Sequence, residues 1–139
     1  MRPEDARRAD TRAWLEKAER DLHSARHALT AADPLRDDAA FHCQQAIEKT
    51  LKAFLTWHDT PFRKTHSLEE LGRQCSGIDR TLLTLVDEAA PLSEYAWSFR
   101  YPGPADAPTA DEVDQAMDVA SRILAEIRSR LPADVPPQG

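Results

Sequence analysis

A chain of 139 residues is long enough for one domain with a buried core. Only four residues are glycine and 6% are aromatic, while Ala, Leu, Glu and Arg are abundant, which favours helices over sheets. The net charge of −6 excludes attraction to nucleic acid by the overall field of the molecule, so an anionic ligand would need a local group of basic side chains.

The first predicted helix runs from Asp10 or Thr11 to Leu29, after a flexible N-terminus over residues 1–10. Its buried stripe, with spacings of three and four, contains Trp14, Ala18, Leu22, Ala25 and Leu29. Asp33-Pro34 ends the helical pattern, because proline disfavours helical geometry in the residue before it.

The second predicted helix runs from about residues 36–38 to Trp57, and its stretch 41–53 is the most informative part of the chain. An apolar stripe recurs along it at Ala40, Cys43, Ile47, Leu51 and Phe54. On another face, the same spacing gives a polar row of His42, Gln45, Lys49 and Lys52, with Glu48 beside them. Two interpretations are open: a surface for a phosphate or a partner helix, or a solvated face with a Glu48–Lys52 ion pair.

Residues 58–66 are predicted to form a loop that contains Arg63, Lys64 and His66. These three donors precede a helix N-terminus at Ser67, where side chains and backbone N–H groups could hold an anion together. The alternative is that His66 packs at the mouth of the bundle while the basic pair is solvated.

Three further helical segments are predicted. Ser67, in a capping box with Glu70, opens a short helix to Gln74. Gly77 and Asp79 mark a turn, a helix follows over Arg80–Ala90, and Leu92–Phe99 adds another short turn.

A proline-rich loop over Arg100–Pro108 precedes a second capping box, formed by Thr109 and Glu112. The last helix runs from there to Leu131, with its inner face at Val113, Ala116, Val119, Ala120, Ile123 and Ile127. Residues 132–139 are expected to be a disordered tail. The predicted fold is therefore an all-α, up-and-down bundle of four main helices plus a short helix, in one domain over residues 11–131.

Arg100-Tyr101-Pro102 follows an aromatic run. Arg100 could pair with a carboxylate such as Glu48 and lock the loop onto the second helix, or it could bind a phosphate. Tyr101 is more typical of a core or an interface than of base stacking.

The sequence gives no pattern for a metal site, a membrane span or secretion. His23 and His27 have a zinc-compatible spacing but no third or fourth ligand, so we expect no metal and no cofactor. Cys43 and Cys75 form no metal pattern and are expected to be reduced and structural. There is no apolar run near the ~20 residues of a membrane span and no signal peptide pattern, so we expect a cytoplasmic protein.

Three blocks, residues 41–53, 64–68 and 100–102, resemble the HEPN family (higher eukaryotes and prokaryotes nucleotide-binding domain) in order and spacing. The resemblance extends over Thr11–Leu131 and implies a HEPN-like helical bundle. It also implies that the polar row lies at a dimer or ligand surface, with the ligand-binding candidates His42, Gln45, Glu48, Lys49, Lys52, Lys64, His66, Arg100 and Tyr101.

Many HEPN proteins look like metal-independent ribonucleases, with an arginine and a histidine about four to six residues apart near the start of the last helix. This chain departs from that pattern, because no histidine follows His66. Arg36–His42 and Arg20–His27 fit the spacing elsewhere. The weak catalytic candidates are therefore His42, His66, Arg100 and Arg36.

We expect a module that binds a nucleotide, RNA or a partner protein rather than an enzyme. The resemblance implies a small nucleotidyltransferase-like partner in a toxin–antitoxin-like pair. A symmetric homodimer through the second or the last helix is expected, since two-fold pairing is the commonest soluble assembly. The alternatives are a metal-independent ribonuclease, toxin-like, with a non-standard Arg/His site, and a purely structural dimerisation domain.

Overall fold

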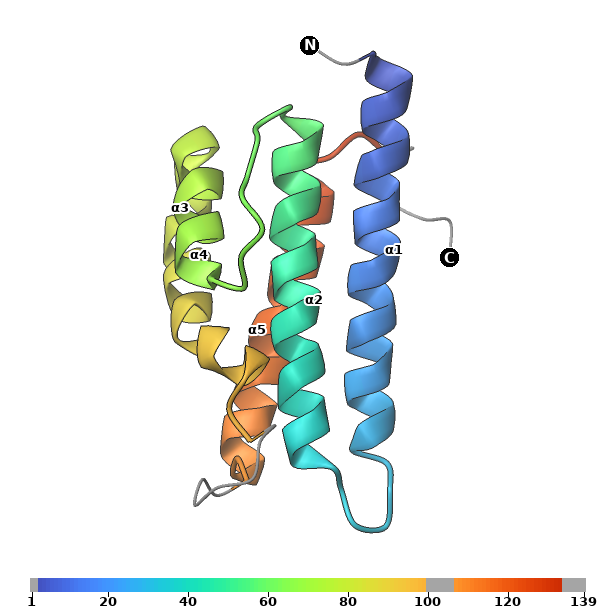
Figure 1. Ribbon diagram of the computed structural model, residues 1–139, viewed down its shortest axis with the longest axis vertical. Helices are drawn as coiled ribbons and strands as arrows, with labels where there is room; N and C mark the ends of the chain where they lie inside the picture. Colours follow the sequence, from blue (N-terminus) through green and yellow to red (C-terminus); the bar gives the residue numbers. More distant parts are fainter. Residues whose placement is uncertain (1–2, 100–106, 134–139) are drawn as a thin grey trace.

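The computed structural model describes residues 3–99 and 107–133, and over these residues the chain is helical with no strand. The predicted all-α bundle is confirmed (Figure 1). The elements in chain order are α1 (Glu4–Ala28), α2 (Arg36–Trp57), α3 (Leu68–Ile78), the 3-10 helix η1 (Arg80–Leu82), α4 (Leu83–Ala89), the 3-10 helix η2 (Ala90–Ala96) and α5 (Ala110–Ser129).

Helix α2 is the centre of the bundle. Figure 1 shows α1 on one side of it, α3 and α4 on the other, and α5 behind. Its predicted apolar stripe is confirmed, since Ala40, Cys43, Ile47, Leu51 and Phe54 are all buried. Fourteen of its 22 residues are buried, so neighbouring elements also cover much of its polar side.

Helix α1 begins at Glu4, so the predicted start at Asp10 or Thr11 was too late, and residues 4–10 are helical rather than flexible. The cause is a long-range contact. Arg7 Nη1 donates to the Trp57 carbonyl oxygen (2.6 Å), and the Arg7 guanidinium lies 4.7 Å from the centre of the Trp57 ring. These bonds fix the first turns of α1 against the end of α2.

The connection from α3 to η2 differs from the prediction. Helix α3 continues through Gly77 to Ile78, past the predicted end at Gln74. The single helix predicted over Arg80–Ala90 is divided into η1 and α4, and Asp79 caps η1 by accepting from the Thr81 N–H (3.0 Å). Gly72 allows α3 to lie close to α4, because a Cβ at this position would be 2.9 Å from the Cβ of Val86.

The two predicted capping boxes have different outcomes. Thr109 and Glu112 form both bonds of a box at the start of α5, as predicted. At α3, Ser67 Oγ accepts from the Glu70 N–H (3.1 Å), but the Glu70 carboxylate pairs with Arg63 instead of returning to Ser67. The Ser67 N–H donates to Thr65 Oγ1 (3.0 Å), so the backbone group that Glu70 would have served is already satisfied.

Both cysteines are buried and free, as expected. Burial raises the pKa of the Cys43 thiol and of the Cys75 thiol to about 12, which makes both unreactive. None of the helices in the described part of the chain combines the length and apolar character needed to cross a membrane. The predicted tail lies outside the described residues from residue 134 onward.

Candidate functional site

Asp21 of α1 holds two side chains of α2. Asp21 is 8% exposed, its Oδ1 lies 2.9 Å from Nδ1 of His42, and its Oδ2 lies 2.5 Å from Nζ of Lys49. His42 and Lys49 are separated by about two helical turns and share a face, so one carboxylate can bridge them. This cluster of Asp21, His42 and Lys49 lies where α1 meets α2.

Glu48 organises a second cluster on the other edge of the polar row. It is 4% exposed, its Oε1 lies 2.8 Å from Nδ1 of His66, and its Oε2 lies 3.0 Å from Nζ of Lys52. Gln44 Nε2 donates to the His66 carbonyl oxygen (3.1 Å) and lies 3.3 Å from Glu48 Oε1. These bonds attach the segment of residues 58–67 to α2.

Lys52 is unusual because its charge is buried among aromatic rings. Its Nζ lies 5.4 Å from the centre of the Trp14 ring and 5.7 Å from that of Phe62, and the two rings meet edge to face. The rings and the Glu48 carboxylate replace the lost hydration. The predicted Glu48–Lys52 ion pair is therefore present, but the interpretation of a solvated face is wrong for it.

The two histidines are oriented in the same way. A carboxylate oxygen can only accept a hydrogen bond, so Nδ1 of His42 and of His66 must each carry the hydrogen. Nε2 is then left as the ring atom available to a ligand. The His66 side chain is 63% exposed, whereas that of His42 is 32% exposed.

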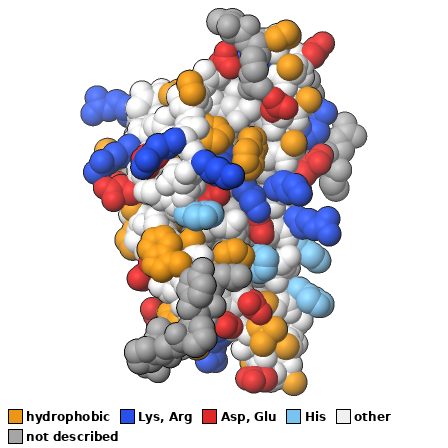
Figure 2. Space-filling view, in the orientation of Figure 1, with side chains coloured by type: hydrophobic (Ala, Val, Ile, Leu, Met, Phe, Trp, Pro, Cys, Tyr) orange, Lys and Arg blue, Asp and Glu red, His pale blue; other side chains and the backbone are white. Residues whose placement is uncertain are grey.

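Basic side chains gather on the same face. Figure 2 shows a band of Lys and Arg side chains across the middle of the face that α1, α2 and the 58–67 segment present, with histidines just below the band. Within the 58–67 segment, Lys64 is exposed, and Arg63 is paired with Glu70 (2.8 Å). We call this surface the polar face, with His42, Lys49, Lys64 and His66 as its defining residues.

The structure brings together most of the predicted site residues. His42 and Lys49 meet at Asp21, and Glu48, Lys52 and His66 form the second cluster, while Gln45 donates to Gln44 Oε1 (2.6 Å) beside it. Arg36 is not brought to His42, because it begins α2 about 9 Å earlier along the helix axis. Arg100 and Tyr101 lie outside the described residues, and so does the predicted Arg100–Glu48 pair.

Two of the backbone donors at the start of α3 are occupied by side chains. The N–H of Leu68, at the start of α3, donates to Ser93 Oγ (2.8 Å), and that of Glu70 donates to Ser67 Oγ. These two backbone donors are therefore not open to an anion at this end of the helix. Among the described residues, no three His, Cys, Asp or Glu side chains are grouped to hold a metal ion.

Sequence reasoning missed Asp21 and Gln44. Both fall among the apolar stripes, Asp21 between Ala18 and Ala25 and Gln44 between Ala40 and Ile47. A polar residue within an apolar stripe is buried with the stripe and needs a hydrogen-bond partner inside the protein. This pattern is the feature of the sequence that could have identified both residues.

The class of the protein follows from these features: an all-α bundle with paired charges buried along its central helix. The family follows from a match to the model of the HEPN domain over residues 11–130. The chain therefore belongs to the HEPN domain family, and the predicted family is confirmed.

Two solved structures are similar over most of the chain. The protein TT1696 from Thermus thermophilus is 31% identical, with a TM-score of 0.76, and the match covers 87% of this chain and 98% of that one. ST0689, described as an archaeal HEPN homologue, is 25% identical, with a TM-score of 0.66 and a coverage of 86% and 96%. No curated protein matches the chain.

Proposed function

We propose that this HEPN domain binds a phosphate-bearing ligand, a nucleotide or RNA, on its polar face and does not cleave it. The observation that carries the proposal is the pair of histidines, His42 and His66, which two buried carboxylates hold with Nε2 left for a ligand. The exposed Lys64, two residues before His66, adds an uncompensated positive charge.

Ion pairs within the polar face decide which of its side chains can bind a phosphate. Lys49 and Lys52 are neutralised by Asp21 and Glu48, so neither offers a free charge to a phosphate. Lys64 is the donor that remains free. Nε2 of His42 or His66 accepts a hydrogen bond in the neutral ring and donates one to a phosphate only in the imidazolium form. A phosphate can be contacted by such donors without the global attraction that the net charge of −6 excludes.

The test is a titration of short single-stranded RNA and of nucleotides against the protein, followed by fluorescence anisotropy and by the melting temperature. A ligand that binds the native state raises its stability. We expect Lys64→Glu to weaken RNA binding and to lower the slope of log affinity against log salt by about 0.7, the value for one contact with a single strand.

The matched control is Arg80→Glu, which makes the same change of charge at the start of η1. It should leave binding unchanged when the RNA is too short to bridge two sites. If neither RNA nor any nucleotide shifts the melting temperature, the binding proposal fails and the purely structural alternative gains support.

Ribonuclease activity is the second candidate, and the same histidines favour it. Two imidazoles with oriented Nε2 atoms are suited to act as general base and general acid. Against it, the arginine–histidine spacing of the family's ribonucleases is missing from the last helix, and the hydrogen bonds of the two imidazoles go to carboxylates.

An RNA cleavage assay distinguishes the binding module from the ribonuclease. We expect wild-type protein to leave a mixed RNA substrate intact with and without divalent ions, while His42→Ala and His66→Ala lose affinity only. RNA fragments that disappear with His42→Ala, while binding persists, would instead establish the ribonuclease. The nucleotidyltransferase-like partner rests on family resemblance, and its test is direct mixing of the two purified proteins.

A further inference from the structure

Trp97 is an exposed aromatic residue on a fixed stretch of backbone. It follows η2, and its side chain is left 53% exposed. Its N–H donates to the Glu94 carbonyl oxygen (3.0 Å), and the Ser98 N–H donates to the same oxygen (2.7 Å). Because these bonds hold the backbone that carries the indole ring, a ligand could stack on the ring with little ordering of the protein.

The aromatic residues on either side of Trp97 are packed into the protein. Tyr95 is buried, Phe99 packs against the core, and the centres of their rings are 6.2 Å apart. The φ of Phe99 is 66°, in the left-handed region, which costs free energy for a bulky residue. The chain thus turns Tyr95 and Phe99 inward in a strained conformation and leaves Trp97 in solvent.

The other two tryptophans are already covered by cations. Lys52 Nζ lies over the Trp14 ring. The Arg7 guanidinium lies over the Trp57 ring. Within residues 3–99 and 107–133, no cation and no second aromatic ring is paired with that of Trp97. Trp97 is therefore the tryptophan whose ring is available to a ligand.

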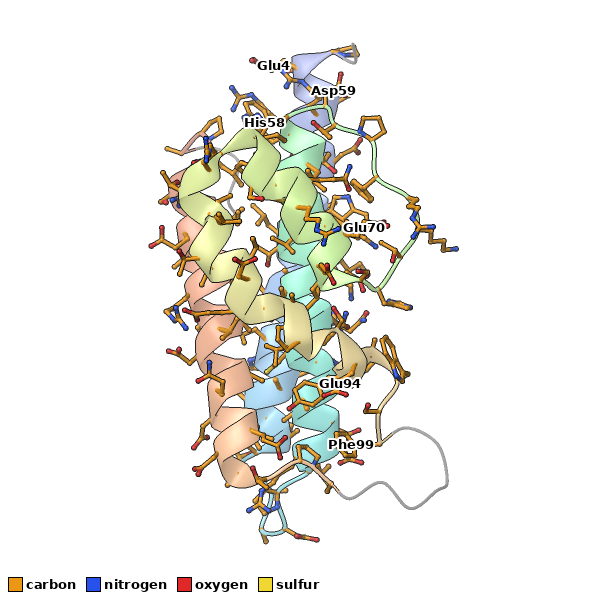
Figure 3. The ribbon with its side chains drawn as sticks, turned by 90° about the vertical axis from the view of Figure 1, so that its left-hand side faces the viewer. Glu4, His58, Asp59, Glu70, Glu94 and Phe99 are labelled. Carbon is orange, nitrogen blue, oxygen red and sulfur yellow. The ribbon has the colours of Figure 1, made fainter. Side chains whose placement is uncertain are left out.

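Trp97 lies beside the polar face. Ser93 Oγ of η2 accepts from the N–H of Leu68 (2.8 Å), the residue that directly follows the 58–67 segment. Trp97 comes four residues after Ser93. Figure 3 shows the chain that follows η2, up to the labelled Phe99, just below the end of the 58–67 segment, and Figure 1 agrees.

Charge and hydrogen bonding define how a ligand would approach the indole ring. Glu94, three residues before Trp97, is exposed and negative, so a phosphate is favoured at Lys64 and not beside η2. Nε2 of a neutral His66 can accept a hydrogen bond from the ribose 2′-hydroxyl, which RNA has and DNA lacks. The base joined to that ribose can stack on an indole only when it is unpaired, because a duplex encloses its bases.

We propose that Trp97 is a base-stacking residue, on which an unpaired base of single-stranded RNA lies while the adjoining phosphate binds at Lys64. The inference rests on the proposed function of the polar face and adds two requirements to it, a nucleobase and an unpaired strand. It also adds to the ligand-binding residues a side chain that lies outside α2 and the 58–67 segment.

The test compares a single strand of about six adenosines with an abasic RNA strand of the same length, by fluorescence anisotropy. We expect Trp97→Ala to weaken binding of the adenosine strand by about five- to 150-fold, the range that corresponds to one stacked base. Trp97→Phe should keep much of the affinity. Trp97→Ala should not weaken the abasic strand, because that strand has no base to stack.

The controls separate stacking from phosphate binding and from structure. Lys64→Glu should weaken both strands alike, since it acts on the phosphate. Leu83→Ala is the matched change of an exposed apolar side chain, because Leu83 is 48% exposed and begins α4, outside the polar face. It should leave both strands unaffected. The adenosine strand should quench the indole fluorescence of wild-type protein but not that of Trp97→Phe, and melting temperatures confirm that each variant is folded.

The outcomes distinguish this proposal from the proposed function. Equal affinity of wild-type protein and Trp97→Ala for the adenosine strand overturns stacking and leaves the proposed function standing, and so does an equal loss on both strands. A DNA strand of the same sequence that binds as tightly overturns the assignment to RNA. Binding of a mononucleotide without binding of the strand overturns the requirement for a strand. If no RNA and no nucleotide binds wild-type protein, the proposed function fails and stacking fails with it.

Discussion

At the residue scale, the carboxylate of Glu112 shows how a single charge supports a helix. It accepts from the Thr109 N–H (2.9 Å) at the start of α5. This backbone hydrogen bond, and secondly the Thr109 hydroxyl, lower the pKa of the Glu112 carboxyl below its usual 4.5. The negative charge also lies at the positive end of the helix dipole.

A pH-dependent contribution to stability follows from this lowered pKa. The carboxylate stabilises the fold above pH 4.5, and the stabilisation is lost as the pH falls through the lower pKa of the folded state. Glu112→Gln keeps the shape of the capping box but cannot ionise. We therefore expect wild-type protein to exceed the variant in free energy of unfolding at neutral pH, and the difference to vanish in acid.

Denaturant unfolding at a series of pH values measures this difference, and NMR titration of Glu112 measures its pKa. A difference between the two proteins that stays constant into acid would contradict the assignment.

Residue patterns predicted some partners and missed others. The Thr109–Glu112 box was predictable because its residues are three apart, and local spacing determines their geometry. Asp21 was not predicted as a site residue, because its partners His42 and Lys49 lie on another helix. The spacing of residues along one helix gives no information about where a neighbouring helix packs.

At the scale of elements, the contact between α3 and α4 depends on the missing side chain of Gly72. A methyl group there would lie 2.9 Å from Val86 Cβ, a distance that requires a helix to shift. We expect Gly72→Ala to lower the free energy of unfolding by about 1–3 kcal/mol, the usual cost of overpacking.

Gly77 provides the matched control in the same helix. A Cβ there meets open space, and its φ is not positive, so Gly77→Ala should instead stabilise by about 0.4–1 kcal/mol. Urea unfolding of both variants measures the contrast. Equal effects of the two substitutions would show that the close approach at Val86 does not govern the α3–α4 contact.

The boundaries of elements were less predictable than their existence. The helical spacing of apolar residues identified α2 and α5 correctly. Every residue that was predicted to lie on the inner face of α5 is buried. The start of α1 was missed because it depends on Arg7 reaching Trp57, 50 residues away in the chain. The end of α3 was missed because glycine is typical of a turn, although Gly77 lies within the helix.

At the scale of the whole molecule, α1, α2 and the 58–67 segment are joined by the buried pair of Glu48 and Lys52. Removing one partner leaves a buried charge without compensation, which costs about 3–5 kcal/mol. We expect Lys52→Met to destabilise the protein by this amount, with Glu48→Gln/Lys52→Met recovering a large part of the loss.

Arg73→Met is the control, since the Arg73–Glu69 pair has side chains 78% and 59% exposed. It should change stability by less than about 0.5 kcal/mol. Chemical denaturation of the wild-type protein, Lys52→Met, Glu48→Gln and the double variant measures the coupling, and Arg73→Met is measured beside them. If Lys52→Met behaves like Arg73→Met, the buried pair is not a structural centre of the bundle.

This cluster explains how far the site could be predicted. The spacing of α2 placed His42, Lys49 and Lys52 on one face. In the structure His42 and Lys49 meet at Asp21, while Lys52 pairs with Glu48 in the second cluster. Periodicity does not say what covers a face, so the burial of Glu48 and Lys52 by Trp14, Phe62 and His66 was not predicted. That covering depends on tertiary packing.

The position of Asp21 has a consequence for the register of the two longest helices. Leucine and alanine side chains along α1 and α2 pack with little preference between one alignment and the next turn, about 5.4 Å away. Sliding by one turn would remove Asp21 from both His42 and Lys49 and leave its buried carboxylate without either partner. Asp21 therefore favours the observed alignment of α1 with α2 over alignments that are shifted by one helical turn.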